Sequence, residues 1–164
     1  LGAGETGEAV LRGPTMMARY LDDEASTAEI QKFGWHHTGD IGRRDEDGYF
    51  YITDRKRDLI ISGGFNIFPF EVESALMQHP AVQDCAVIGV PDKWGEAVKA
   101  CVQLKPGAAA DETTLIDWCK TRIGSMKAPK SVDFVDNLPR SPVGKVLKRD
   151  LRAPYWADRT RGVG

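Results

Sequence analysis

Three polar side chains in this sequence have chemical types and backbone settings that suit the binding of a ligand with hydroxyl or anionic groups. Asp40 follows Gly39, and a single carboxylate on a flexible backbone can accept hydrogen bonds from two vicinal hydroxyls. The guanidinium of Arg55 offers a planar fork of donors that suits the oxygens of an anionic group. Lys145 follows Gly144, and its ammonium on a flexible stem is a movable positive charge. Ordinary turn or surface charges are the alternative for each residue, so the elements that carry them must be considered.

From Asp58 onward the sequence predicts a self-sufficient α+β domain, with a short central sheet flanked by helices. Gly63 and Gly64 separate two short apolar runs, which is typical of a two-residue hairpin turn. Pro69 suits the first turn of a helix, and Asp111 can N-cap a second helix. The expected strands span residues 59–62, 65–68, 82–90, 98–104 and 131–135, and the expected helices span 69–78, 111–123 and 148–152.

The first 54 residues predict short strands and turns with too little apolar material for a core of their own. Strands are expected over residues 8–12, 40–44 and 49–53, the last two joined through Asp47-Gly48, where glycine allows a positive φ. Such a strip reads as the last strands of a larger domain. Its unpaired edges could lead to self-association of the chain.

Three blocks in order give the sequence a resemblance to a known family. They are Thr38-Gly39-Asp40, the segment 54–73 (DRKRDLIISGGFNIFPFEVE), and Ser141-Pro142-Val143-Gly144-Lys145. Together they resemble the C-terminal part of the acyl-activating, or adenylate-forming, enzymes, which comprise acyl-CoA and aryl-CoA synthetases, peptide-synthetase adenylation domains and luciferases. The resemblance extends from about Gly7 to Arg152.

The resemblance implies a domain organisation and a reaction. Residues 1–56 would be the terminal β-rich segment of the large adenylation domain, 57–152 a small mobile C-terminal lid domain, and 153–164 a tail. The full enzyme would convert a carboxylic acid and ATP with Mg²⁺ to an acyl-adenylate and pyrophosphate, and CoA would then displace AMP. The carboxylic acid, fatty or aromatic, is not readable from this segment, and the segment alone is expected to be inactive. The alternatives are an adenylation domain that loads a carrier protein and a non-catalytic module with the lid fold.

Roles for individual residues follow from the resemblance. Asp40 matches the aspartate that binds the ribose hydroxyls of ATP, and Arg55 the arginine that contacts the ribose or phosphates. Lys145 matches the lysine of the adenylation half-reaction, where a cation offsets repulsion between the carboxylate and the α-phosphate. Arg57 falls at the hinge position, which is usually Asp or Lys, so Arg is a departure.

The expected CoA-binding residues are Gly63, Gly64, Trp94, Lys127 and Lys130. The glycines would line the tunnel for the pantetheine arm, and the continuation Asn66-Ile67-Phe68-Pro69 follows the CoA-ligase pattern. Trp94 would stack near the adenine of CoA, and the two lysines would contact its phosphates. Ala128 stands where some related ligases have an Arg, so the CoA contact that this Arg would make is not expected here. The structural alternatives are that the two glycines only form a hairpin turn, that Trp94 packs against the protein, and that the two lysines are solvated surface residues.

Composition limits the class of protein. The chain has 164 residues, 41% hydrophobic and 28% charged, which favours a packed fold over disorder. It shows no membrane-length apolar run, no signal peptide and no initiator Met, so a cytoplasmic protein and a fragment are expected. Its three cysteines show no metal-ligand spacing, so no bound metal is expected. Residues 120–152 hold nine Lys and Arg against three Asp, but with Phe134 as the only aromatic residue in this range they do not indicate nucleic-acid binding.

Overall fold

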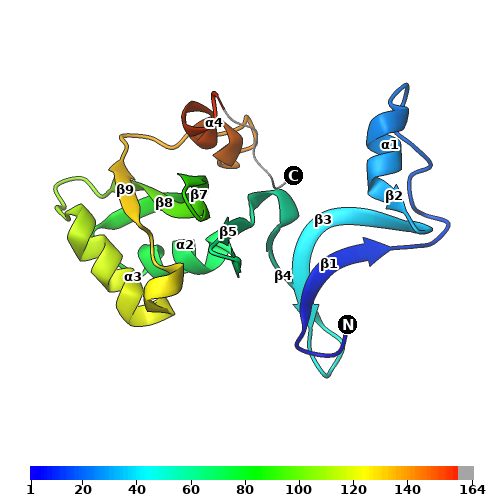
Figure 1. The fold of residues 1–164 in the computed structure, drawn as a ribbon, viewed down its shortest axis with the longest axis horizontal. Helices are drawn as coiled ribbons and strands as arrows, with labels where there is room; N and C mark the ends of the chain where they lie inside the picture. The colour runs from blue at the N-terminus through cyan, green and yellow to red at the C-terminus, as the bar shows by residue number, and fades with distance from the viewer. Residues whose placement is uncertain (159–164) are drawn as a thin grey trace. The chain divides into compact units, whose positions relative to one another are not determined.

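The chain folds as two compact units. The computed structural model describes residues 1–158, and the boundary between the units lies between Arg57 and Asp58 (Figure 1). Each unit has its own β-sheet and its own helices. The α+β class predicted from the sequence is confirmed.

The first unit is a four-stranded antiparallel sheet built on one long strand. Strand β3 (Trp35–Arg44) pairs along one edge with β1 (Thr6–Leu11) and along the other with β2 (Gln31–Lys32) and β4 (Phe50–Arg55). The sequence predicted β1 and β4 closely, but it placed the start of β3 at Asp40. The turn between β3 and β4 forms as expected, with Gly48 at a φ of 90°.

The helix α1 (Glu24–Ile30) of the first unit was not predicted. Its N-cap is Asp23, whose carboxylate accepts a hydrogen bond from the backbone N–H of Ser26 at 2.9 Å. The helix buries none of its residues. It therefore lacks the apolar period by which a helix is recognised in a sequence.

Burial in the first unit is sparse. Among residues 1–57, all of which the structure describes, Ile41 is the single buried hydrophobic side chain. Large apolar side chains such as Phe50 and Ile52 are 73% and 59% exposed. Most of the sheet therefore gains little from the hydrophobic effect within this unit.

The second unit has a five-stranded sheet centred on strand β8 (Gly95–Leu104). Strand β7 (Val82–Asp92) pairs antiparallel with β8 over most of its length, and β9 (Ser131–Phe134) pairs parallel with the other edge of β8. The hairpin of β5 (Ile60–Ser62) and β6 (Phe65–Ile67) joins that edge through the Ser62–Gly95 pair.

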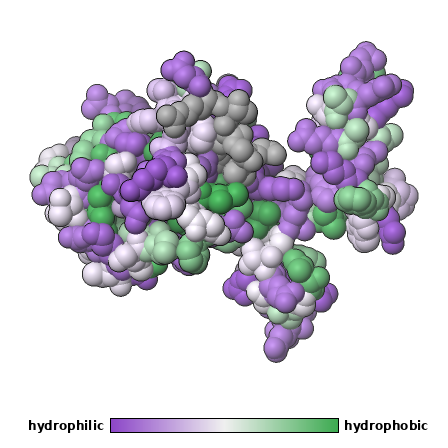
Figure 2. Space-filling model, in the orientation of Figure 1, coloured by the Kyte–Doolittle hydropathy of each residue, from purple (hydrophilic) through white to green (hydrophobic). Residues whose placement is uncertain are grey.

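Helices cover both faces of this sheet (Figure 1). Helices α2 (Pro69–Met77) and α3 (Glu112–Lys127) pack on one face, while α4 (Lys148–Arg152) and the 3₁₀ turn Ala153–Tyr155 pack on the other. Apolar surface, green among purple polar side chains, is visible on both units (Figure 2).

Strand alternation gives the second unit two apolar cores, because successive side chains point to opposite faces. Val87 and Val98 belong to the larger core under α2 and α3, together with Leu76 and Leu115. The smaller core lies on the α4 side and contains Ala86, Ile88, Val90, Cys101 and Leu138.

The starts of α2 and α3 agree with the prediction from the sequence. Pro69 is the first residue of α2, and the carboxylate of Asp111 caps α3 by accepting from Thr114 N–H at 2.7 Å. Helix α3 runs past the predicted end at Ile123 to Lys127, across a break at Gly124, where φ is 81°. Of the expected tail, residues 153–158 include Trp156, whose indole N–H donates to Gly89 O at 3.0 Å, and residues 159–164 lie outside the described residues.

The three cysteines are buried and free. Burial raises the pKa of Cys101 and of Cys119 to about 11, and it raises the pKa of Cys85 further. Their thiols are therefore protonated at neutral pH and poor nucleophiles.

The contrast in burial predicts a contrast in hydrogen exchange. Backbone amides of β7 and β8 should exchange through global unfolding of the second unit, because their side chains form its cores. Amides of residues 1–54 should exchange much faster through local opening. Amide exchange followed by mass spectrometry on the 164-residue chain checks this, and equal protection of both units in a monomer would contradict it.

Candidate functional site

Asp40 and Arg55 lie side by side in the first unit. They face each other across the β3–β4 ladder, and the Arg55 Nε donates to the Asp40 carboxylate at 2.8 Å. The two side chains remain 29% and 51% exposed. The sheet thus presents a carboxylate and a guanidinium side by side, and both are partly open to solvent. Their assignment to ATP stays a prediction.

Glu8 supports the part of β3 that carries Asp40, and it was not predicted as a site residue. One oxygen of its carboxylate accepts from the backbone N–H of Gly39 at 3.1 Å. The other oxygen lies 3.0 Å from His37 Nδ1 and 3.1 Å from Lys56 Nζ. Gly39 has a φ of 71°, a conformation that glycine adopts readily, so Glu8 fixes an otherwise flexible peptide.

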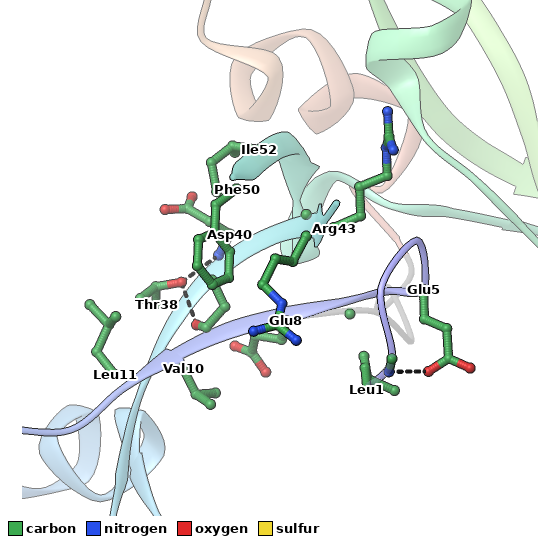
Figure 3. Close-up of a pocket in the computed structure, with 15 residues that line it drawn as sticks. Leu1, Glu5, Glu8, Val10, Leu11, Thr38, Asp40, Arg43, Phe50 and Ile52 are labelled. Carbon is green, nitrogen blue, oxygen red and sulfur yellow. Dashed lines mark hydrogen bonds between the residues drawn. The ribbon is translucent and has the colours of Figure 1, made fainter. Parts of the chain in front are cut away.

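Thr38 adds a second support for Asp40. Its hydroxyl donates to Ala9 O at 2.7 Å and accepts from the Asp40 N–H at 3.1 Å, so it lies between β1 and the aspartate (Figure 3). Beside it is an open cavity of about 670 Å³ lined by Glu8, Asp40 and Arg43 together with apolar side chains such as Phe50 (Figure 3). The Thr-Gly-Asp block is therefore held rigidly at the edge of a cavity.

Electrostatics favour the ionised form of Glu8. Partial burial alone would raise its pKa, but hydrogen bonds from His37, Lys56 and the Gly39 N–H, together with the charge of Lys56, lower the pKa below the ordinary value of 4.5. The carboxylate is therefore charged at neutral pH and available to all three donors.

Lys145 sits in a tight loop of the second unit. Residues Arg140 and Val146 pair as an isolated bridge at its base. Within the loop Ser141 N–H donates to Lys145 O, and Gly144 N–H donates to Ser141 O, both at 2.8 Å. Gly144 adopts a φ of 82°, which closes the turn.

The side chain of Arg140 also braces the loop. Its guanidinium donates to Gly144 O at 2.6 Å and forms an ion pair with Asp84 on β7. The side chain of Lys145 is exposed, and within residues 1–158 its ammonium has no ion pair or hydrogen bond. The loop thus presents on a braced backbone a cation that is unpaired among the residues that the structure describes.

Gly63, Gly64 and Trp94 lie close together, although Trp94 is far from the glycines in the sequence. The glycines form the two-residue turn between β5 and β6, with φ values of 57° and 83°. The Gly63 N–H donates to Trp94 O at 3.0 Å, and the Trp94 side chain is 68% exposed. A Cβ atom added to either glycine would meet no atom within 4 Å, so the turn faces open space beside an exposed aromatic ring.

Lys127 and Lys130 have partners of their own at the end of α3. Lys127 Nζ forms an ion pair with Glu71 on α2 at 2.7 Å, and Lys130 Nζ donates to Ser125 O at 3.0 Å. These contacts give both lysines a structural role, and nothing in the described residues joins them to the Gly63–Trp94 group. Their assignment to CoA phosphates stays a prediction.

Arg57 is the last residue of the first unit and lies in the 3₁₀ turn Lys56–Asp58. Its side chain is exposed, whereas the next residue, Asp58, is buried. The change of unit therefore occurs at the expected hinge residue, and the hinge role stays a prediction.

Residues 1–158 contain no group of three or more His, Cys, Asp or Glu side chains placed to bind a metal. None of the helices in this range combines the length and the hydropathy that a bilayer crossing requires.

Comparison with known proteins places these features in a family. Residues 71–145 match the AMP-binding enzyme C-terminal domain. The chain is 49% identical over 153 residues to a feruloyl-CoA synthase of Amycolatopsis sp, which covers 93% of the chain and 31% of that protein. It is 48% identical over 148 residues to a long-chain-fatty-acid–CoA ligase of Bacillus subtilis, covering 90% of the chain and 26% of the ligase. The chain thus spans less than a third of the length of these curated relatives.

Solved structures agree with the sequence relatives. ATP-bound MatB from Rhodopseudomonas palustris superposes with a TM-score of 0.88 at 39% identity, over 94% of this chain and 31% of MatB. The o-succinylbenzoate CoA synthetase MenE of Bacillus subtilis, in complex with its acyl-adenylate intermediate, gives a TM-score of 0.83 at 39% identity, over 92% of this chain and 31% of MenE. The chain therefore belongs to the acyl-activating, or adenylate-forming, enzyme superfamily, and its second unit contains the AMP-binding enzyme C-terminal domain.

Proposed function

We propose that this chain is the lid-bearing part of an AMP-forming acyl-CoA ligase. The complete enzyme joins a carboxylic acid to ATP, which enters as its Mg²⁺ complex. The carboxylate oxygen attacks the α-phosphorus, the bond to the bridging oxygen of pyrophosphate breaks, and an acyl-adenylate forms. The CoA thiolate then attacks the acyl carbon, AMP leaves, and an acyl-CoA thioester is the product.

The ammonium of Lys145, on its braced loop and unpaired within residues 1–158, is the observation that carries the proposal. Attack of a carboxylate on a phosphate brings two anions together, so the transition state needs a positioned cation. Lys145 has such a cation, exposed and without a partner among the described residues. An ion-paired lysine would have to break its pair before each turnover.

The nucleotide part of the proposal rests on the first unit. The Asp40 carboxylate accepts hydrogen bonds from the two ribose hydroxyls of ATP, and Arg55 next to it contacts the ribose or the phosphates. The ion pair between Arg55 Nε and Asp40 Oδ1, at 2.8 Å, keeps both groups in one orientation before the ligand binds. Such preorganisation lowers the entropy that binding would otherwise lose.

The Gly63–Gly64 turn and Trp94 form the proposed CoA surface. The absence of side chains at the turn lets the narrow pantetheine arm run along the backbone, and the exposed indole offers a flat surface for the adenine. We infer that the Lys145 loop serves adenylation and this surface serves thioester formation. A rotation of the second unit about Arg57 between the two steps follows, in the manner of other gating motions in enzymes.

The identity of the acceptor thiol distinguishes this proposal from the carrier-protein alternative. The presence of catalysis distinguishes it from a non-catalytic module. A carrier protein delivers its own pantetheine arm, so free CoA would not be a substrate. A binding module would bind ATP without acid-dependent pyrophosphate release. Both distinctions are measurable on the intact protein.

Lys145→Ala in the intact enzyme should abolish adenylation and spare the second step. The loss of the transition-state cation should lower acid-dependent ATP–pyrophosphate exchange by about a hundredfold or more. Thioester formation from supplied acyl-adenylate should continue. Lys120→Ala, which removes an exposed lysine of α3, is the matched control. Wild-type exchange in the Lys145 variant would contradict the assignment.

Glu8→Ala should weaken ATP binding, because the Gly39 N–H loses its acceptor and Asp40 its fixed orientation. We expect the KM for ATP to rise about tenfold, which corresponds to ~1.4 kcal/mol, while Glu46→Ala in the exposed turn should have no effect. Since the folded state lowers the pKa of Glu8, its contribution to stability is present above pH 4.5 and is lost as the pH falls. Unfolding measured against pH should therefore show wild type and variant converging in acid. An unchanged KM for ATP would show that Glu8 does not position the site.

Gly64→Leu should raise the KM for CoA and leave pyrophosphate exchange intact, because the new side chain projects into the open space at the turn. The positive φ of 83° adds a strain of about 1–2 kcal/mol. Gly107→Leu imposes the same kind of strain at a φ of 74° in another open turn, so it is the control for stability. Equal CoA dependence in a folded Gly64 variant and wild type would favour the carrier-protein alternative.

A further inference from the structure

Two largely buried ion pairs hold helix α4, which directly follows the Lys145 loop. Lys148 Nζ lies 2.8 Å from Glu73 Oε1 on α2, with side chains 17% and 18% exposed. Arg152 Nη1 lies 3.0 Å from Asp58 Oδ1, with side chains 13% and 12% exposed. Lys148 and Arg152 are four residues apart, so they lie on one face of the helix.

Both carboxylates belong to well-fixed parts of the second unit. Glu73 Oε1 also accepts the Val87 N–H of β7 at 2.7 Å, so its position is set by the sheet as well as by α2. Asp58 is the first residue of the unit and precedes β5, which is hydrogen-bonded into the sheet. Helix α4 is therefore fastened at its two ends to separate points of the unit.

Helix α4 needs this fastening. It has five residues, its N-cap Leu147 makes no side-chain capping bond, and none of its residues is fully buried. A helix of this length is not stable by itself in water. Contacts of Leu151 with the smaller core, together with the two ion pairs, must hold it in place.

The position of α4 determines the position of the backbone at Lys145, because only two residues separate them. Val146 and Leu147 link the lysine to the helix; Val146 forms the bridge with Arg140 and packs against the smaller core. The Leu147 N–H donates to Pro139 O at 2.8 Å, across the base of the loop. A shift of α4 would therefore move the base of the loop on the side that carries Lys145.

We propose that Lys148 and Arg152 are positioning residues for Lys145, acting through α4 and their pairs with Glu73 and Asp58. The inference rests on the proposed function of Lys145 in adenylation. Neither side chain touches the reactants. Their effect is to fix the place from which the Lys145 ammonium reaches the α-phosphate.

Half-reaction kinetics on the intact enzyme test this role. Arg152→Gln and Lys148→Gln should lower the rate of adenylation by about ten- to a hundredfold, the scale expected when a reacting group is displaced by about an ångström. Thioester formation from supplied acyl-adenylate should be unchanged, and Arg152→Lys should recover part of the lost rate. Arg149→Gln is the control, because this neighbouring side chain is 86% exposed. Equal loss of both half-reactions, or no loss, would overturn the positioning role.

Hydrogen exchange in the 164-residue chain separates this inference from the proposed function. Arg152→Gln should speed exchange at the amides of Ser141, Gly144 and Leu147, while those of β7 and β8 keep their protection. Unchanged exchange at the loop would overturn the positioning inference even if the wild-type enzyme forms acyl-adenylate. Faster loop exchange combined with an intact wild-type protein that forms no acyl-adenylate would overturn the proposed function.

Discussion

Strand β8 constrains the whole second unit, because it hydrogen-bonds with β7 on one edge and with β9 and the end of β5 on the other. Its side chains alternate between the core under α2 and α3 and the core on the α4 side. One face therefore supplies most of the burial, and the other supports the helix next to Lys145. A slip of one residue in this strand would exchange the two faces. The Gly95 end of β8 also brings Trp94 to the Gly63–Gly64 turn.

The two units contribute different kinds of order to the proposed chemistry. In the first unit, order comes from polar contacts around the Glu8 carboxylate, since Ile41 is its single buried hydrophobic residue. In the second unit, order comes from packed cores, and polar contacts only place the loop and helix at the surface. The proposed alternating mechanism requires a fixed nucleotide site and a rigid body that carries a cation, and these two kinds of order are compatible with that proposal.

Most of the fold was predictable because its signals are local. A run rich in β-forming residues predicted β7, apolar alternation predicted β8, and residue type predicted the glycine turn, the Pro69 start and the Asp111 cap. Helix α1 was missed because it buries no side chain, although Asp23 carries a capping signal. Contacts between distant residues gave no local signal: Glu8 reaches Gly39 across 31 positions, and Arg152 reaches Asp58 across 94. The pairing of Lys127 with Glu71 was invisible for the same reason.

The proposed function requires that the intact protein activate a carboxylic acid through an adenylate. Product analysis with ATP labelled at the α-phosphate tests it most directly, using a panel of fatty and aromatic acids with CoA. Our account predicts labelled AMP that appears only with a suitable acid, with one acyl-CoA thioester formed for each AMP. Labelled ADP as the product, or AMP formation independent of any acid, would contradict it.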